Sequence, residues 1–319
     1  MEEILSVKNL AKYFAKGGFL RQREVVRAVD DISFSIKKGQ TLVLAGESGS
    51  GKTTIARLIL RAIEPDSGEI VFDNAKISND ASSLRKIRKD CQMIHQDPYA
   101  SIDPRMKVFD IVKEPLDIHN LGKPDERKKM VFDALRDVKL DPDEVISKYP
   151  HMLSGGQRQR VVIARAISTK PKMVIADEPV SMLDVSVRVG ILELIKELQD
   201  KHGISFLYIT HDLSTARYVG HVIAILYLGK IVEFGNIDDV LSQPMHPYTQ
   251  ALIDSISEPD PNNLHSERKI RVNNPLDIDA YQGCRFRARC PYAIEKCKQE
   301  PHLELVGNQR TVACFVKIN

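Results

Sequence analysis

The sequence predicts an α/β fold with a mostly parallel sheet. Runs of mainly apolar residues occur at 41–45, 172–176 and 222–228, and such runs are typical of strands that are covered on both faces. A pattern with helical spacing extends over 184–201, where four apolar side chains share one face, namely Ile191, Leu194, Ile195 and Leu198. Because strands alternate with helices along the chain, we expect a parallel sheet with helices on both faces.

The elements before residue 97 follow from local patterns. Apolar and polar residues alternate at 4–10 and 25–36, which predicts two half-buried strands with a loop at 17–23 between them. The other elements expected in this part are a helix at 54–60, a turn at 65–68, a strand at 69–72, a helix at 83–90 and a buried strand at 91–96.

A charged stretch with helical patterning follows at 106–148. We expect Pro115, Pro124 and Pro142 to break it, and we interpret it as a separate helical subdomain. The remaining expected elements are a helix at 154–168, a strand at 205–209, a short helix, and the strand at 222–228. After Gly235 the chain becomes polar and rich in proline, so we place a domain boundary near Gln243.

Length, composition and charge limit the class of protein. The 319 residues fit one large domain with an appendage, and 43% apolar with 28% charged residues is typical of a soluble globular protein. The net charge of +3 is too small to indicate a nucleic-acid partner. The acidic Glu2 and Glu3 argue against a secretory signal, and the longest apolar run, 222–228, is too short to cross a bilayer. We therefore expect a cytosolic protein, or one held at a membrane by a partner.

A glycine-rich loop at 46–53 organises the chain. Its residues fit the pattern G-x-x-x-x-G-K-[ST] and are Gly46, Glu47, Ser48, Gly49, Ser50, Gly51, Lys52 and Thr53. It lies between a buried strand and a helix, which is the context that this pattern requires. The glycines let backbone N–H groups approach phosphate oxygens, and the helix start at Thr54 adds further free N–H groups. Lys52 is predicted to reach the β- and γ-phosphates of a nucleotide, and the Thr53 hydroxyl to hold Mg²⁺.

Two acidic residues end the strand at 172–176. In an enzyme with a phosphate loop, the first of them, Asp177, is expected beside Mg²⁺, and the second, Glu178, is expected to polarise a water molecule.

A second helix start is suited to an anion. Ser154 is a good N-cap, Gly155 and Gly156 leave the backbone bare, and Gln157 continues as helix. Because one nucleotide needs only one phosphate loop, we expect this second element to serve a nucleotide held by another subunit.

Together these motifs resemble the nucleotide-binding subunit of ABC transporters. The resemblance rests on the phosphate loop, on Leu-Ser-Gly-Gly-Gln at 153–157 (the signature), on Asp-Glu-Pro at 177–179 and on His211. It implies a P-loop NTPase (RecA-like) core at 1–243, with an antiparallel β subdomain and a helical subdomain at about 97–160. It also implies a head-to-tail dimer in which each of two ATP molecules contacts the phosphate loop of one subunit and the signature of the other.

The same resemblance implies roles by position. Phe14, or alternatively Tyr13, matches the aromatic residue that stacks on adenine. Gln96 matches a glutamine that contacts Mg²⁺ and couples to the membrane partner, and Asp184 matches the aspartate of the D-loop. The implied catalytic residues are Glu178, His211 and Lys52, with His211 at the γ-phosphate, and the implied Mg²⁺ contacts are Thr53, Gln96 and Asp177.

Further segments resemble one subtype, the oligopeptide/dipeptide permease ATPases. They are 96–101, 149–151, 184–187, 246–249 and the insertion at 17–23. This likeness implies ATP hydrolysis that drives uptake of di- or oligopeptides, although relatives carry nickel or sugars instead. The implied partners are a second homologous ATPase in a heterodimer, two integral membrane permease subunits and, indirectly, an external substrate-binding protein. The implied location is the cytoplasmic face of the cell membrane. Nucleic acid is not expected as a partner.

The segment 244–319 forms a C-terminal extension with four cysteines, Cys284, Cys290, Cys297 and Cys314. Cysteines at this density in a reducing compartment suggest thiolate ligands for a soft metal, although the C-x2-C pairs usual in zinc ribbons are missing. The extension resembles that of permease ATPases, some of which hold a [4Fe–4S] cluster. Zinc and four metal-free thiols stay open as alternatives.

Nearby residues bear on the cysteine hypothesis. Arg285, Arg287 and Arg289 would offset the negative charge of thiolates, or else face solvent. The fifth cysteine, Cys91, lies in a predicted buried strand and is expected in the core.

Two other classes of function are weaker. An ABC ATPase that acts on ribosomes or DNA usually carries two cassettes or a long coiled coil, and this chain has neither pattern. A regulatory module without turnover would not need the intact Asp177, Glu178 and His211.

Overall fold

An eight-stranded sheet is the centre of the fold in the computed structural model, which describes residues 2–16, 24–255, 281–307 and 309–316. Its strand order is β11-β12-β10-β9-β3-β8-β7-β6. The bounds are β3 (Thr41–Ala45), β6 (Cys91–Ile94), β7 (Met173–Asp177), β8 (Ser205–Thr210), β9 (Val222–Tyr227), β10 (Lys230–Asn236), β11 (Glu304–Leu305) and β12 (Thr311–Val312). The five strands from β6 to β9 in this order pair in parallel, as predicted, whereas β10, β12 and β11 add antiparallel pairs at the other edge.

A second, antiparallel sheet covers one face of the first. Its order is β2-β1-β4-β5, with β1 (Glu3–Lys16), β2 (Glu24–Lys37), β4 (Ser67–Phe72) and β5 (Ala75–Lys76). The predicted loop and insertion at 17–23 lie outside the described residues. Both long strands extend further than the alternating pattern predicted, because they pair with each other along nearly their whole length.

Alternate residues of β3 enter two separate cores. Leu42 and Leu44 pack with α1 (Lys52–Ile59) and the antiparallel sheet, whereas Val43 and Ala45 belong to the core on the other face. That face carries α7 (Val185–His202), α8 (Leu213–Val219), α9 (Ile237–Ser242) and α10 (Pro247–Asp254). Burial on both faces explains the continuous apolar runs in the sequence. Cys91 is 1% exposed within the first of these cores, as expected, and α2 (Ala81–Asp90) leads into its strand.

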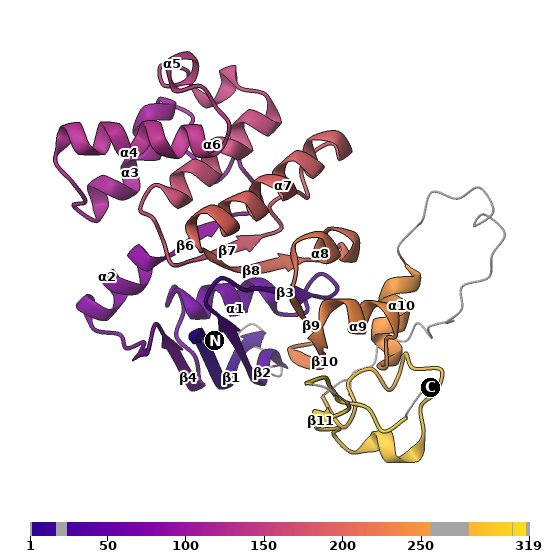
Figure 1. The fold of residues 1–319 in the computed structure, drawn as a ribbon. Coiled ribbons are helices and arrows are strands. Elements are labelled where there is room, and N and C mark those ends of the chain that lie inside the picture. The colour runs from indigo at the N-terminus through magenta and orange to yellow at the C-terminus, as the bar shows by residue number, and fades with distance from the viewer. Residues whose placement is uncertain (1, 17–23, 256–280, 308, 317–319) are drawn as a thin grey trace.

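The predicted helical subdomain lies at the β6 end of the sheet (Figure 1). It consists of α3 (Val108–Ile118), α4 (Pro124–Asp137), α5 (Pro142–Val145), the 3-10 turn Pro150–Met152 and α6 (Gly155–Ile167). Pro124 and Pro142 stand at helix starts, where a missing N–H costs nothing. The prediction that Pro115 breaks a helix is wrong, since α3 continues through it and buries its ring in the core.

The C-terminal segment joins the opposite edge of the sheet (Figure 1). β12 pairs with β10, with Glu233 opposite Val312 and Phe234 opposite Thr311, and a 3-10 turn spans Glu295–Lys298. Sequence patterns gave no sign of these short strands. The boundary expected near Gln243 falls between α9 and α10, and residues far beyond it return to the central sheet.

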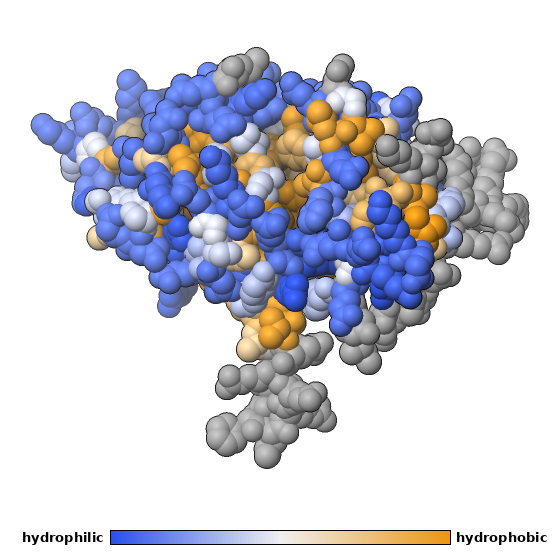
Figure 2. Space-filling model, turned by 90° about the horizontal axis from the view of Figure 1, so that it is seen from below, coloured by the Kyte–Doolittle hydropathy of each residue, from blue (hydrophilic) through white to orange (hydrophobic). Residues whose placement is uncertain are grey.

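The face of the molecule seen from below is mainly hydrophilic, with groups of hydrophobic residues between the polar ones (Figure 2). In the part of the chain that the structure describes, none of the helices has the length and apolar character needed to cross a bilayer.

Candidate nucleotide-binding site

The phosphate loop connects β3 to α1, as predicted. Gly46, Gly49 and Gly51 all have positive φ. A Cβ atom at Gly46 would collide with the carbonyl of Leu226, and one at Gly51 with the carbonyl of Ala28. Only glycine fits these positions, because the loop lies directly against two neighbouring segments. Ser48, Gly49 and Thr53 are exposed, and Thr54 is half-buried.

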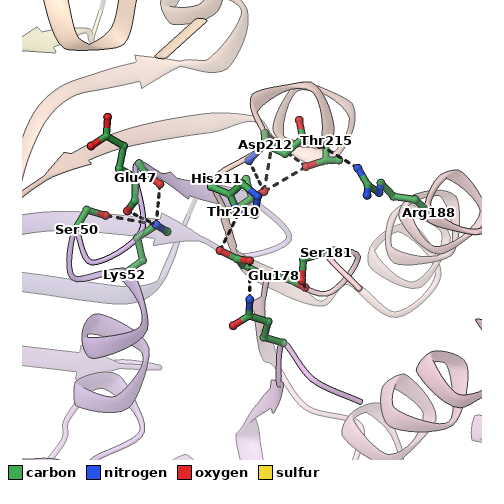
Figure 3. Close-up of polar contacts among 12 residues, drawn as sticks. Glu47, Ser50, Lys52, Glu178, Ser181, Arg188, Thr210, His211, Asp212 and Thr215 are labelled. Carbon is green, nitrogen blue, oxygen red and sulfur yellow. Dashed lines mark hydrogen bonds and ion pairs between the residues drawn. The ribbon is translucent and has the colours of Figure 1, made fainter. Parts of the chain in front are cut away.

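Lys52 is buried beneath this loop. Its Nζ donates to the carbonyl oxygens of Gly46 (2.7 Å) and Glu47 (2.9 Å) and to Ser50 Oγ (3.4 Å) (Figure 3). Burial lowers the pKa of Lys52, while the charges of Glu178, Asp177 and Glu47 oppose that shift. The ammonium group thus binds acceptors within its own loop. The oxygens of a bound polyanion would be stronger acceptors than these carbonyl and hydroxyl oxygens.

Asp177 ends β7 next to the loop. Burial raises its pKa, and a hydrogen bond from Thr53 acts in the opposite direction. Asp177 is 5% exposed. The structure therefore brings together the two side chains predicted to hold Mg²⁺ most directly, and their oxygen atoms are the donors that this ion prefers.

Glu178 follows with a left-handed backbone (φ 47°), which is uncommon for a residue with a Cβ atom. Its N–H donates to the Ile209 carbonyl at 2.9 Å. Its carboxylate accepts a hydrogen bond from Gln96 Nε2 at 2.9 Å and pairs with His211 Nδ1 at 2.9 Å (Figure 3). The carboxylate of Glu178 thus joins residues that follow three separate strands. The left-handed backbone of Glu178 directs this carboxylate toward Gln96 and His211.

A network missed by the sequence analysis supports His211. Asp212 N–H donates to Thr210 Oγ1 (2.9 Å), and Arg188 of α7 contacts the Asp212 carboxylate at 3.3 Å (Figure 3). Arg188 also donates to the carbonyl of Leu183, in the segment before Asp184. The guanidinium group of Arg188 thus links the loop that carries His211 to the segment that carries Asp184, the predicted D-loop. Arg188 carried no recognisable sequence signal, because its role depends on a partner 24 positions away.

The signature begins α6 as predicted. Ser154 caps the helix: its Oγ accepts from Gln157 N–H at 3.2 Å, while Gln157 Oε1 accepts from Ser154 N–H at 3.1 Å. Ser154 and Gly155 are exposed, and Gly156 packs against Val187 of α7 so closely that a Cβ atom would lie 2.6 Å from its Cγ1. Among the residues described, no hydrogen bond links Ser154–Gln157 to the phosphate loop of the same chain.

The aromatic candidates differ in their contacts. Tyr13 donates its hydroxyl to Asp30 at 2.6 Å, a bond that raises the pKa of Tyr13 to about 12. Phe14 is 41% exposed, with Lys12 Nζ 5.7 Å from its ring centre. Asp184 is exposed at the start of α7.

The four C-terminal cysteines are free thiols, and Cys297 is buried. Burial raises the pKa values of Cys284 and Cys290 to about 11, and the other cysteine thiols contribute to both shifts. Nowhere in the described ranges do three or more His, Cys, Asp or Glu side chains form a group suited to a metal ion. The structure thus does not support the predicted cluster.

The proposed charge balance at the cysteines is wrong for two of the three arginines. Arg285 pairs with buried Asp30, and Arg289 pairs with Glu47 of the phosphate loop at 2.9 Å. Both guanidinium groups neutralise carboxylates of the nucleotide-binding domain.

Comparison with known proteins agrees with this geometry. A family model described as ABC transporter matches residues 29–181. The oligopeptide transport ATP-binding protein AppF of Bacillus subtilis is 41% identical over 99% of this chain and 98% of its own length. The chain belongs to the ABC transporter family. The dipeptide transport ATP-binding protein DppF of Haemophilus influenzae is 40% identical to this ABC transporter ATPase, over 98% of this chain and 96% of DppF.

Further comparisons concern the C-terminal region and the fold of the ABC transporter ATPase. A model described as the C-terminal region of oligopeptide/dipeptide transporters matches residues 232–297. The dimeric ATP-binding cassette MJ0796, solved with ADP and Pi, superimposes with a TM-score of 0.64 at 31% identity over 73% of this chain and 98% of its own. CbiO1 of Clostridium perfringens gives a TM-score of 0.67 at 28% identity, over 76% and 92%. The predicted P-loop fold and the ATPase class are confirmed.

Proposed function

We propose that this chain is the ATP-hydrolysing subunit of an importer for di- and oligopeptides. The observation that carries the proposal is the meeting of Gln96, Glu178 and His211 beside the phosphate loop. The peptide as cargo is supported by the names of the relatives and by the match of the C-terminal region.

Each side chain in this site has a defined task. Lys52 exchanges the loop carbonyls for phosphate oxygens when ATP binds. Thr53 and Asp177 would hold Mg²⁺, which neutralises phosphate charge when bound. Glu178 orients and activates the attacking water, and Gln96 and His211 hold its carboxylate in place until the γ-phosphate arrives.

A second subunit completes the site. The exposed Ser154 and Gly155 leave the start of α6 open to an external phosphate group, and the dimeric relative supports this pairing. We infer a heterodimer with a second homologous ATPase, in which the γ-phosphate joins the phosphate loop of one subunit to the signature of the other. Phe14 stacks on adenine, since it is 41% exposed, whereas the hydrogen bond to Asp30 fixes the orientation of the Tyr13 ring.

A groove beside Gln96 suits the membrane partner. It has a volume of about 320 Å³ and is lined by residues of β6, α3 and α6, among them Met93, His95, Ile118 and Arg165. Ile118 is 64% exposed at its rim. Its mixed lining of apolar and basic side chains fits a short helix of one permease subunit, which would hold this chain at the cytoplasmic face of the membrane, while the second ATPase would bind the second permease subunit. An external binding protein would deliver the peptide to those subunits.

Substitutions at two residues test the ATPase assignment. Glu178→Gln is expected to bind ATP normally but to lose about 10²–10⁴-fold in turnover, because general-base catalysis contributes on that scale. Lys52→Ala is expected to lose nucleotide binding. For each variant, ATP binding and phosphate release by the assembled transporter are measured. Unchanged turnover of Glu178→Gln would remove that residue from its role, and normal binding by Lys52→Ala would refute the phosphate site.

For the C-terminal cysteines we retain the [4Fe–4S] proposal. It rests on the four closely spaced cysteines in the sequence and on a backbone hydrogen bond from Cys284 N–H to the Cys297 carbonyl at 2.9 Å, which places these two residues side by side. Anaerobic purification followed by iron and zinc analysis and an absorbance spectrum tests it. Iron with a charge-transfer band is the expected result, and zinc alone or no metal would overturn it.

A further inference from the structure

The C-terminal segment, which is the extension that begins at residue 244, binds the phosphate loop through a charged pair. Arg289 Nη1 donates to Glu47 Oε2 at 2.9 Å and Nη2 donates to Glu47 Oε1 at 3.0 Å. Such a bidentate pair fixes the orientation of both groups. Arg289 is itself held, since Nη1 also reaches Tyr227 Oη at 3.3 Å and the guanidinium lies 5.7 Å from the ring centre of Phe286.

A second contact reaches the backbone of the same residue. Glu47 N–H donates to Tyr248 Oη at 2.8 Å. Tyr248 is 1% exposed on α10 and packs against Tyr227 and Phe286, with ring centres 4.5 and 5.5 Å away. Its hydroxyl is therefore a rigid acceptor, and it directs this N–H group toward the C-terminal segment.

A third contact holds the far side of the loop. Gly229 N–H donates to the Ser50 carbonyl at 2.8 Å. The preceding residue, Leu228, accepts a hydrogen bond from Arg285 through its carbonyl. The turn between β9 and β10 thus transmits the position of the C-terminal segment to Ser50, as Arg289 and Tyr248 do to Glu47.

These contacts bear on anion binding. Glu47 places a carboxylate on a loop that must receive a highly charged triphosphate, and an unpaired negative charge there would repel it. Lys52 already donates to the Glu47 carbonyl, so any shift of this residue also moves the acceptor that positions the ammonium group.

We propose that Arg289 and Tyr248 are positioning residues for ATP: acting through Glu47, they hold the phosphate loop in its binding shape and neutralise its one carboxylate. The inference rests on the proposed function, because it assumes that ATP binds at this loop. It assigns the C-terminal segment a part in nucleotide binding.

Binding of the β,γ-imido analogue of ATP with Mg²⁺ to the full chain tests this inference by calorimetry. Arg289→Ala should raise Kd about fivefold, as expected when a half-exposed ion pair worth about 1 kcal/mol is lost. Tyr248→Phe, which keeps the aromatic packing, should raise Kd about threefold. In the assembled transporter both should raise KM for ATP with little change in kcat. Arg287→Ala is the matched control, because Arg287 lies two residues before Arg289 and, among the contacts of the described residues, has no ion pair or hydrogen bond with the phosphate loop.

A double-mutant cycle separates positioning from simple loss of stability. In a Glu47→Ala background, Arg289→Ala should cause no further rise in Kd, because its effect passes through Glu47. An equal further rise in that background would overturn the proposal, and so would parental Kd values for both Arg289→Ala and Tyr248→Phe. Lys52→Ala in the same titration keeps the two hypotheses apart: if it binds like the parent, the phosphate site itself is refuted.

Discussion

A buried ion pair between β10 and the C-terminal segment gives the sharpest stability prediction. Glu233 is fully buried and Arg310 is 6% exposed. Arg310 donates to Glu233 Oε1 through both Nε (3.2 Å) and Nη2, and its Nη1 donates to the Asp239 carbonyl at 3.2 Å. Glu233 also accepts the N–H groups of Met245 and His246, at 3.1 and 3.0 Å. One carboxylate thus joins β10, the start of α10 and the segment before β12.

Arg310→Ala should destabilise the protein strongly. It would leave the Glu233 charge buried without its partner, which costs about 3–5 kcal/mol. For a chain of this size, about 2 °C of melting temperature corresponds to each kcal/mol, so the expected fall is roughly 6–10 °C. Equilibrium urea unfolding and a thermal scan of the full chain measure it.

Two further variants test the reasoning. Lys76→Ala breaks a solvent-exposed pair with Glu69 (2.7 Å) and should leave the melting temperature nearly unchanged. Glu233→Gln combined with Arg310→Met removes the charge, keeps an oxygen acceptor for one of the two N–H groups and fills the space of the arginine stem, so it should recover part of the stability. A loss below about 1 kcal/mol for Arg310→Ala, or a double variant as unstable as the single one, would refute the buried-charge argument.

Two other predictions concern the signature and α10. Gly156→Ala should cost about 1–3 kcal/mol, because the new Cβ atom would lie 2.6 Å from Val187 Cγ1, and Val187→Ala in the same chain should restore most of that loss in urea unfolding; no rescue would show that the clash is not the cause. Burial lowers the pKa of His246 from its ordinary value of 6.5 to about 3. Between pH 6.5 and pH 3 the unfolded chain therefore binds a proton at this residue, whereas the folded chain does not. The stability of the folded state should thus fall as the pH drops from 6.5 toward 3. From pH 7 to pH 5 this residue should account for roughly 2 kcal/mol. His246→Asn keeps an acceptor for the Tyr248 N–H group and should lose about that much of the acid dependence; an unchanged pH profile would contradict the assignment.

Local sequence patterns were enough to predict the fold class and most of the nucleotide site. The phosphate loop, the acidic pair and the signature are contiguous motifs whose chemistry requires those residues at those spacings, so local pattern was enough to find them. The strands of the central sheet could be recognised because residues such as Leu42 and Val43 are buried on opposite faces, which leaves a continuous apolar run. The helix through Pro115 was mispredicted because the burial of its ring outweighs a lost hydrogen bond, and burial is not visible in a local pattern.

Contacts between distant segments depend on the three-dimensional fold and could not be found from local patterns. Glu178 contacts Gln96 and His211 because three parallel strands end at the same edge, and no spacing in the sequence encodes those distances. The same holds for Arg289, whose sequence position beside cysteines suggested a role in balancing thiolate charge. The chain folds back so that this guanidinium group instead reaches Glu47, 242 positions earlier. There it compensates the negative charge of a carboxylate on the phosphate loop.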